Sequence, residues 1–203
     1  MSDTPEERRI TDVGTLKAFG HPLRLRLYRA LYVRRTATAS QLAEEVDGAV
    51  SLVSYHLRKL AEHGLIEENP KARSGDGRER WWRPAQAGLS FARRDFDDAP
   101  EKLAAHTAVT RALVDERTEA YVRYLDEQPA WSPEWQAAAI CSDYLLRLTA
   151  AELAALSGEL RAVVKKYAER GDAAHAAGDT EGRENAALHL YGFPFRTGPQ
   201  GTP

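Results

Sequence analysis

The sequence contains a single cysteine, Cys141, among its 203 residues. One cysteine cannot form an internal disulfide, and this favours a reducing compartment. No run of about 18 uncharged apolar residues occurs, as a membrane-spanning helix would require. The first twelve residues, MSDTPEERRITD, carry acids where a secretion signal needs an apolar segment. We therefore expect a cytoplasmic protein with no membrane partner.

Motifs of catalysis and cofactor binding are also missing. The sequence has no glycine-rich phosphate loop, no Gly-x-Ser-x-Gly and no His-Glu-x-x-His. His106 has no second histidine at ligand spacing on its predicted helix, and Cys141 stands alone. We therefore expect no enzyme, no metal site and no cofactor.

The charge is unevenly distributed along the chain. The net charge of −2 does not by itself suggest a nucleic-acid partner. Residues 1–96, however, hold 17 Lys and Arg against 13 Asp and Glu, whereas residues 97–203 hold 11 against 17. A basic module followed by an acidic one is one pattern of DNA-binding proteins, although drift in composition produces it too. We expect a DNA-binding domain at 1–96 and a dimerisation and possible effector domain at 97–203.

Three helices are predicted in the first half. Apolar residues recur at three- and four-residue spacing from Pro22 to Val33, with proline in the first turn. Thr38 and Gln41 form a capping box that starts a second, shorter helix. Asp47-Gly48 interrupts that helix, and a third runs over residues 49–63 before Gly64. Only a tight turn separates the second and third helices.

A two-stranded hairpin is predicted directly after the third helix, over residues 65–83. It contains an apolar pair, a loop with Pro70 and turn-forming glycines, and then Trp81-Trp82. Because successive side chains point to opposite faces of a sheet, we expect one tryptophan to pack on the helices. Two helices with a tight turn and a hairpin form a helix-turn-helix with a wing.

The third helix, predicted at 49–63, has a polar face opposite its apolar one, and this face is the main candidate binding surface in the sequence. On a helical wheel its aliphatic residues and His56 gather on or beside one face, and we expect His56 to be a packed histidine. Hydroxyls, a tyrosine and forked arginine donors on the other face suit phosphates and base edges. An ordinary solvated face is the alternative for this window taken alone. The predicted DNA-binding residues of helix and wing are Ser51, Ser54, Tyr55, Arg58, Lys59, Arg73, Arg78 and Arg80.

The segments HPLRLRLYRAL, TASQLAEEV and VSYHLRKLAEHGLIEE resemble the winged helix-turn-helix of ArsR-like bacterial transcriptional regulators, over roughly residues 10–90. The resemblance implies a dimeric repressor on a palindromic operator, with the third helix as the recognition helix and wing arginines at the flanking minor groove or backbone. The sequence departs from the family at Ala49, where a polar N-cap often stands. It also lacks the cysteine pairs or His and Asp clusters of metal-sensing members.

The second half is predicted to contain a long helix from Pro100 to Gln128, which is our candidate dimer element, and then a small α/β domain. In that domain, strands are predicted at 139–149 and 187–195, and Thr149 with Glu152 caps a helix that reaches about Arg170. We interpret residues 171–185 as a mobile connection. The fold class is thus mainly α with small β. An aromatic pocket for a small-molecule effector is a further hypothesis, although such residues are usually core material; its members are Trp131, Trp135, Tyr144 and Tyr191.

The sequence therefore predicts a DNA-binding transcriptional regulator, a homodimeric repressor reading double-stranded DNA with helix 49–63 and wing 65–83. The alternative is a winged-helix module for protein assembly or RNA binding, without operator recognition.

Overall fold

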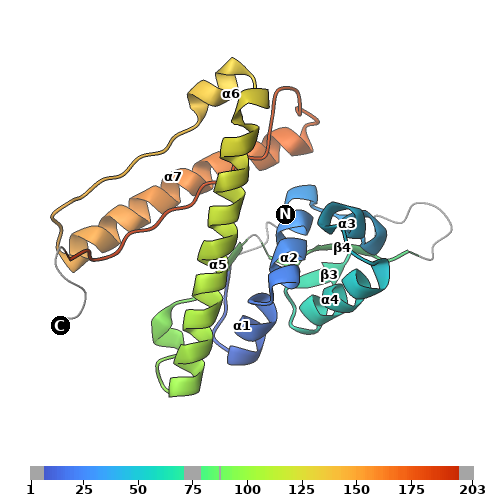
Figure 1. Ribbon diagram of the computed structural model, residues 1–203, viewed down its shortest axis with the longest axis horizontal. Helices are drawn as coiled ribbons and strands as arrows, with labels where there is room; N and C mark the ends of the chain where they lie inside the picture. Colours follow the sequence, from blue (N-terminus) through green and yellow to red (C-terminus); the bar gives the residue numbers. More distant parts are fainter. Residues whose placement is uncertain (1–6, 71–78, 87, 197–203) are drawn as a thin grey trace. The chain divides into compact units, whose positions relative to one another are not determined.

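The computed structural model describes residues 7–70, 79–86 and 88–196. The chain forms two compact units, Met1–Glu127 (unit 1) and Gln128–Pro203 (unit 2) (Figure 1). This division differs from the boundary at residue 96 expected from the sequence. The long helix belongs to unit 1, because it packs against the first helix of the chain.

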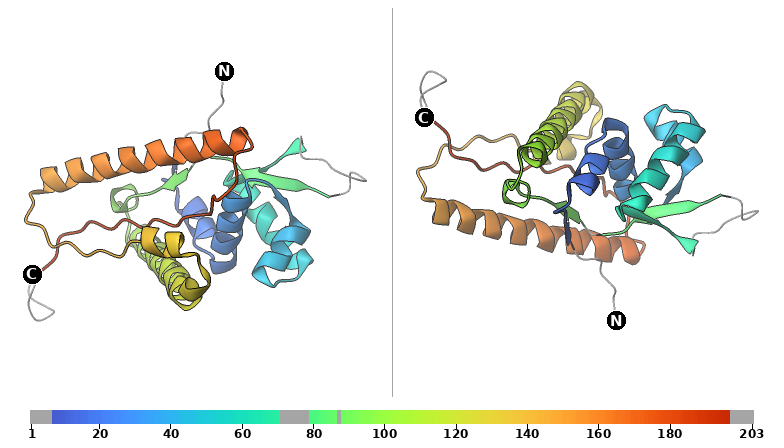
Figure 2. Two further views of the ribbon diagram at one scale, coloured as in Figure 1. Left: turned by 90° about the horizontal axis from the view of Figure 1, so that it is seen from above. Right: turned by 90° about the horizontal axis from the view of Figure 1, so that it is seen from below.

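Unit 1 is built mainly of helices. Their bounds are α1 Val13–Phe19, α2 Pro22–Arg34, α3 Ala39–Val46, α4 Val50–Glu62 and α5 Pro100–Glu127, with a short η2 at Arg93–Asp95. The first four helices gather on one side of α5 (Figures 1 and 2). The helices predicted from periodicity at α2, α3, α4 and α5 are confirmed within two residues. The capping box at the start of α3 is present, with Thr38 and Gln41 bonding to each other's backbone.

The predicted hairpin is confirmed and gains a third strand. β3 (Ile66–Glu68) and β4 (Trp81–Pro84) pair antiparallel, and β4 also pairs with the two-residue β2 (Ala37–Thr38). Trp82 is buried and joins the core of the helices, whereas Trp81 is only half-buried. A second, parallel pair joins β1 (Glu7–Arg9) to β5 (Gly88–Ser90). Unit 1 is therefore a helix-turn-helix with a wing followed by a long helix.

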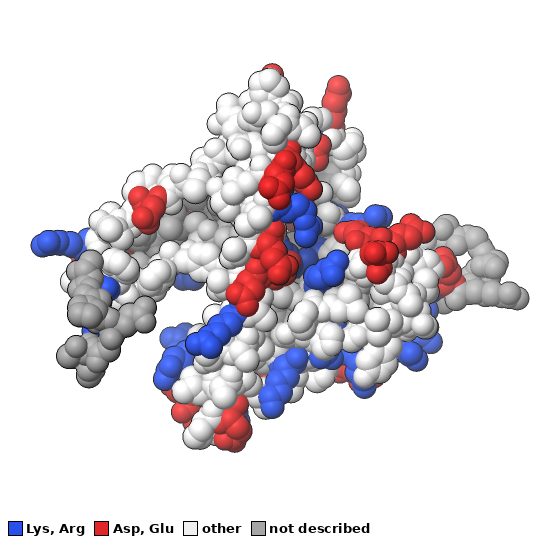
Figure 3. Space-filling view, in the orientation of Figure 1, with Lys and Arg blue, Asp and Glu red and all other residues white. Residues whose placement is uncertain are grey.

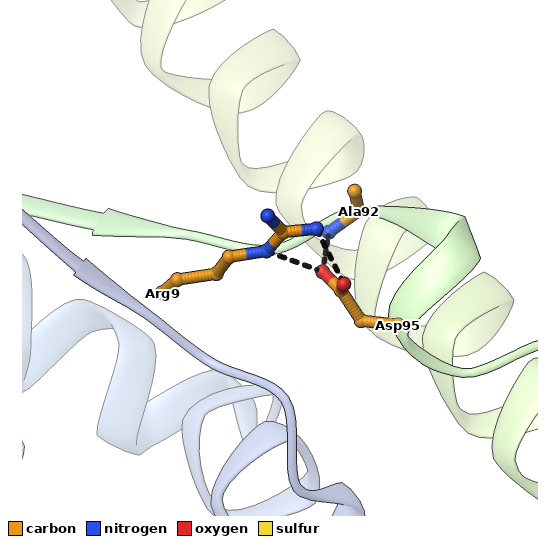
Figure 4. Close-up of polar contacts among 3 residues, drawn as sticks. All are labelled: Arg9, Ala92 and Asp95. Atoms are coloured by element: carbon orange, nitrogen blue, oxygen red, sulfur yellow. Dashed lines mark hydrogen bonds and ion pairs between the residues drawn. The ribbon is translucent and has the colours of Figure 1, made fainter.

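Besides the pairing of β1 with β5, an ion pair links β1 to the segment after the wing. Arg9 in β1 donates from Nε to an Asp95 carboxylate oxygen at 3.0 Å, and the backbone N–H of Ala92 donates to the same oxygen (Figure 4). The Arg9 guanidinium lowers the pKa of the Asp95 carboxyl. This contact fixes η2 beside β1, just before α5 begins.

Helix α5 approaches the end of α1 closely. A Cβ placed on Gly20 would lie 2.4 Å from a methyl carbon of Val109 in α5. The backbone at Gly20 has φ −74°, so a side chain is excluded by space and not by conformation. Farther along α5, Glu116 accepts a hydrogen bond from Arg29 of α2. Glycine at position 20 therefore allows the long helix to pack on the domain.

Unit 2 contains η3 (Gln128–Ala130), α6 (Pro133–Ala138) and α7 (Ala150–Ala176). The capping box of Thr149 and Glu152 is confirmed, but the helix runs six residues past the predicted end at Arg170. Gly171 lies inside it, and the alanines that follow favour helix strongly enough to offset one glycine. Residues 171–176 are therefore helical and not a loose connection.

The two strands predicted for unit 2 are not formed in the single chain. Residues 139–149 and 183–196 have no regular secondary structure. A strand needs a hydrogen-bonding neighbour, and alternation in the sequence cannot supply one. None of the described residues in unit 2 is buried. The α/β character expected of this half is therefore absent from the single chain.

One histidine lies inside the core of unit 1. His56 of α4 is only 6% exposed, which confirms the expectation of a packed residue, and its Nδ1 has no hydrogen-bond partner among the residues that the structure describes. Its ring lies 4.6 Å from that of His21, and the edge of Tyr55 faces it. Burial, followed by the charges of His21 and Arg24, lowers the pKa of His56 below its ordinary 6.5. The folded protein therefore favours the neutral imidazole.

We expect Gly20→Ala to destabilise unit 1 by about 1–3 kcal/mol, because the new methyl group overlaps Val109. In a Val109→Ala background the same change should cost much less, since the overlapping methyl groups are gone. Urea unfolding of the four chains measures this coupling. Equal costs in both backgrounds would contradict the close approach of α1 and α5.

We expect the free energy of unfolding to fall as the pH drops below about 6.5. In that range the unfolded chain protonates His56 while the folded chain, whose His56 pKa is lower, does not, so acid favours unfolding. The decrease between about pH 7.5 and about pH 5.5 should be smaller in His56→Gln. His175→Gln, at an exposed histidine of α7, is the control and should keep the wild-type profile. An unchanged profile in His56→Gln would remove this histidine as the cause.

Candidate nucleic-acid interface

Helix α4 separates its residues into a buried and a bare face. Val53, Leu57 and Leu60 are 0% exposed and pack into the core formed with α2 and α3. Ser51, Tyr55 and Arg58 lie on the other face and are exposed. The helical period, which returns to the same face every three or four residues, separates the two sets. The core therefore fixes which side chains α4 presents to solvent.

The two ends of α4 are held differently. At the carboxyl end, Arg8 of β1 donates hydrogen bonds of 2.9 Å to the backbone oxygens of His63 and Gly64. Gly64 has φ +63°, a conformation that favours glycine and that ends the helix before β3. At the amino end, Ala49 supplies no side-chain cap, as its sequence predicts. No side chain therefore caps the first N–H groups of α4, which are natural partners of an anion.

The turn between α3 and α4 is short because one residue adopts a left-handed conformation. Asp47 has φ +51° and ψ +54°, and its N–H bonds back to α3. Gly48 also donates to the backbone oxygen of Ala43 at 2.9 Å. Three residues, 47–49, thus connect the two helices and place the amino end of α4 next to the carboxyl end of α3.

An open hollow of about 430 Å³ lies between α4, the start of α3 and the base of the wing. Its side chains are hydroxyls, charged groups and apolar residues from these three elements, namely Thr38, Ala39, Ser40, Val50, Ser54, Arg58, Glu79, Arg80 and Trp82. Ser40 donates to Glu79 at 2.9 Å, and Arg80 pairs with Glu68 at 3.0 Å. The hollow brings cationic groups from helix and wing to one concave surface.

Arginine and lysine on α4 differ in their availability. Arg58 is exposed and lines the hollow, and it donates from Nε to the backbone oxygen of Ser54 at 3.3 Å. Lys59 is half-buried, pairs with Glu62 at 2.7 Å and lies 5.9 Å from the centre of the Tyr55 ring. The hydrogen bond with Glu62 is the main reason that the pKa of Lys59 is raised. Arg58 is therefore the stronger candidate for contact with a ligand.

The structure brings three of the eight sequence-predicted site residues to the hollow, namely Ser54, Arg58 and Arg80. Five lie on α4 and Arg80 lies at the wing, while Arg73 and Arg78 fall outside the described residues. Ser54 is half-buried inside the hollow, whereas Ser51 and Tyr55 are open to solvent. Sequence reasoning missed Ser40, which lines the hollow from α3. The signal was present, because Ser40 is the second residue after the Thr38 cap and belongs to the amino end of a helix.

The charge of unit 1 is divided between surfaces. On the face shown in Figure 3, Lys and Arg side chains lie along the edge next to α4, Asp and Glu side chains gather over α3, and both kinds lie along α5. Such a division allows a nearly neutral chain to present a local cationic surface.

The aromatic pocket considered for unit 2 is not closed in the single chain. The rings of Trp131 and Trp135 lie 6.4 Å apart, but Tyr144 is 75% exposed. Among the described residues, no group of three or more His, Cys, Asp or Glu is arranged to hold a metal ion. No helix in the described ranges has both the length and the apolar character needed to cross a membrane.

Comparison with known proteins adds an independent finding. Residues 19–69 match a family described as a helix-turn-helix domain. A solved structure of a Lactococcus lactis ZitR mutant (C30AH42A, apo form) is similar at 17% identity, over 72% of this chain and 81% of that chain, with a TM-score of 0.29. That likeness is too weak to inform the fold or the function. No curated protein matches. The match over α2 to β3 places a helix-turn-helix domain where α4 and its polar face were found, and it supports a DNA-binding regulator of transcription.

Proposed function

We propose that the chain is a dimeric transcriptional repressor of the ArsR-like type, which reads a palindromic operator in double-stranded DNA. The observation that carries this proposal is the bare hydroxyl and guanidinium face of α4 beside the hollow at the wing. An α-helix fits the major groove of B-form DNA, and short hydroxyl side chains let its backbone approach closely.

The side chains divide into two roles. Ser51, Tyr55 and Arg58 point outward from α4 and are the base readers, with the Arg58 fork suited to the two acceptors of guanine. Ser40, the uncapped N–H groups of α4 and Arg80 surround the hollow or its rim and are the phosphate contacts. A phosphate in this hollow would fix the angle at which α4 enters the groove. Ser54 and Lys59 lie between the base readers and the phosphate contacts.

A dimer is proposed because one module of this size contacts little DNA. Two copies of α4 about 34 Å apart would read two half-sites one helical turn apart. Helix α5 is the proposed dimer element within unit 1. Past Leu113, its last buried residue, it carries four exposed apolar side chains, namely Val114, Tyr121, Val122 and Leu125. Tyr121 follows Val114 by seven residues and Leu125 follows Tyr121 by four, so these three lie on one side of the helix.

We expect Arg58→Ala to weaken binding to a selected operator by about 1–3 kcal/mol and to relax the preference for one base pair in each half-site. The operator is obtained first, by sequencing duplexes that the wild-type chain retains from a random library. Arg94→Ala, which removes an exposed arginine outside the helix-turn-helix and the wing, is the matched control. Sedimentation should show the same oligomeric state for all three chains. Unchanged affinity in a gel-shift titration would remove Arg58 from the interface.

We expect Arg80→Ala to weaken binding to all duplexes about equally, because a phosphate contact carries no sequence information. The slope of log affinity against log salt concentration, measured from about 50 to about 200 mM, should decrease by about one for each site lost. In a dimer the substitution removes two phosphate contacts, so the slope should decrease by about two. If the chain retains no duplex from the library at the lowest salt concentration, the regulator proposal fails and the result supports the protein-assembly alternative.

A further inference from the structure

Unit 2 has no interior of its own in the single chain. None of its described residues is buried, although the long helix α7 has a continuous apolar stripe. Along this stripe Val163 is 54% and Tyr167 62% exposed. Leu153 and Leu156 near the start of this 27-residue helix are half-buried, and Gly192 lies against Leu153. The rest of the stripe is exposed and leaves more apolar surface in water than soluble domains usually tolerate. Unit 2 is therefore incomplete without a further surface.

The segment that leads into α7 has the pattern of a strand but no neighbour. Ile140, Tyr144, Leu146 and Leu148 occupy alternate positions, and the backbone is extended both at Ala139 and at Thr149. Tyr144 and Leu145 are about three-quarters exposed, at 75% and 74%. No described strand pairs with this segment. Unpaired backbone groups beside exposed apolar side chains form a ready template for strand addition.

The charges within this segment identify the neighbour. Asp143 and Arg147 lie on the same side of the extended backbone, two positions on either side of Leu145. Both are exposed, and neither forms one of the ion pairs found among the described residues. If two copies of the segment run antiparallel about a two-fold axis at Leu145, each Asp143 stands directly opposite an Arg147 of the other copy. A shift of the axis by one residue loses both opposite-charge pairs.

The chain's own last segment is a poorer neighbour. Residues 187–195 contain no Asp, Glu, Lys or Arg, so they offer no permanent charge to Asp143 or Arg147, and their His189 and Tyr191 have interactions of their own. Pro194 also removes one backbone donor from that segment. The segment returns along α7 instead, where a Cβ on Gly192 would lie 3.2 Å from a methyl carbon of Leu153. A second copy of residues 140–148 is the neighbour with matching charge.

We infer that unit 2 is a self-association surface, in which residues 140–148 of two copies pair as antiparallel β-strands centred on Leu145. The pairing joins the alternate apolar side chains of both copies into one face, and the apolar stripes of the two α7 helices supply the layer that covers it. This surface is separate from α5 and does not depend on DNA binding. The proposed pairing also explains why residues 140–148 have the sequence pattern of a strand but no paired neighbour in the single chain.

A cysteine placed on the axis tests the register in the full chain. In a Cys141→Ser background, Leu145→Cys brings two thiols to directly opposite positions, where Cα atoms of antiparallel strands lie about 4.5–5.5 Å apart, within disulfide reach. Mild oxidation should convert most of the protein to a covalent dimer. The wild-type chain is the matched control, because its exposed Cys141 would face Thr149 of the other copy and lie far from the other Cys141. Equal cross-linking of both chains, or of neither, overturns the register.

Charge reversal tests the partner independently. Asp143→Arg and Arg147→Asp each place like charges opposite each other twice per dimer, so each should weaken the dimer roughly five- to thirtyfold. The double variant restores opposite charges and should return to within about twofold of wild type. Sedimentation at several protein concentrations measures all four chains, and circular dichroism verifies their helix content. A dimer unaffected by the single changes, such as one held by α5 alone, or a double variant weaker than either single one, overturns the proposal.

Discussion

The burial of one face of α4 is the constraint on which the rest of the molecule depends. Val53, Leu57 and Leu60 are fully enclosed by α2 and α3, and the same core takes in Trp82 from the wing. Rotating α4 about its axis would expose these side chains, at about 1.5–3 kcal/mol for each fully buried one. The burial of these side chains therefore fixes the direction in which Ser51, Tyr55 and Arg58 face. Contact with a rigid duplex requires such a fixed orientation.

Positioning of that face comes from contacts far away in the sequence. Arg8 in β1 fixes the carboxyl end of α4, and the Asp47 turn fixes its amino end beside α3. Trp82 joins the wing to the helices and lines the hollow between Arg58 and Arg80. The long helix α5 packs on the domain through the space left at Gly20. Helix α5 thus contacts α1, and α1 in turn contacts α4.

Much of the first unit could be predicted from the sequence, because its signals are local. The capping box at Thr38 starts α3 where expected, as the one at Thr149 does for α7 in unit 2, and periodicity located α2 to α5. Helix α1 was missed because seven residues are too few for a periodic signal. The pairing of β1 with β5 was missed because its strands are about 80 residues apart, and loop closure over such a distance leaves no local pattern. Ser40 entered the site only because α3 and the wing meet there.

By itself, the sequence determined which residues form the helices, which face of α4 is polar, and that helix-turn-helix and wing are consecutive. These properties follow from side-chain periodicity and capping, which act over a few residues. Only the tertiary structure decided that His56 is enclosed beside His21, that the long helix belongs to the first unit, and that the apolar face of α7 lacks cover. Burial and strand pairing depend on neighbours distant in the chain, so alternation at 139–149 indicates a strand but cannot supply its partner.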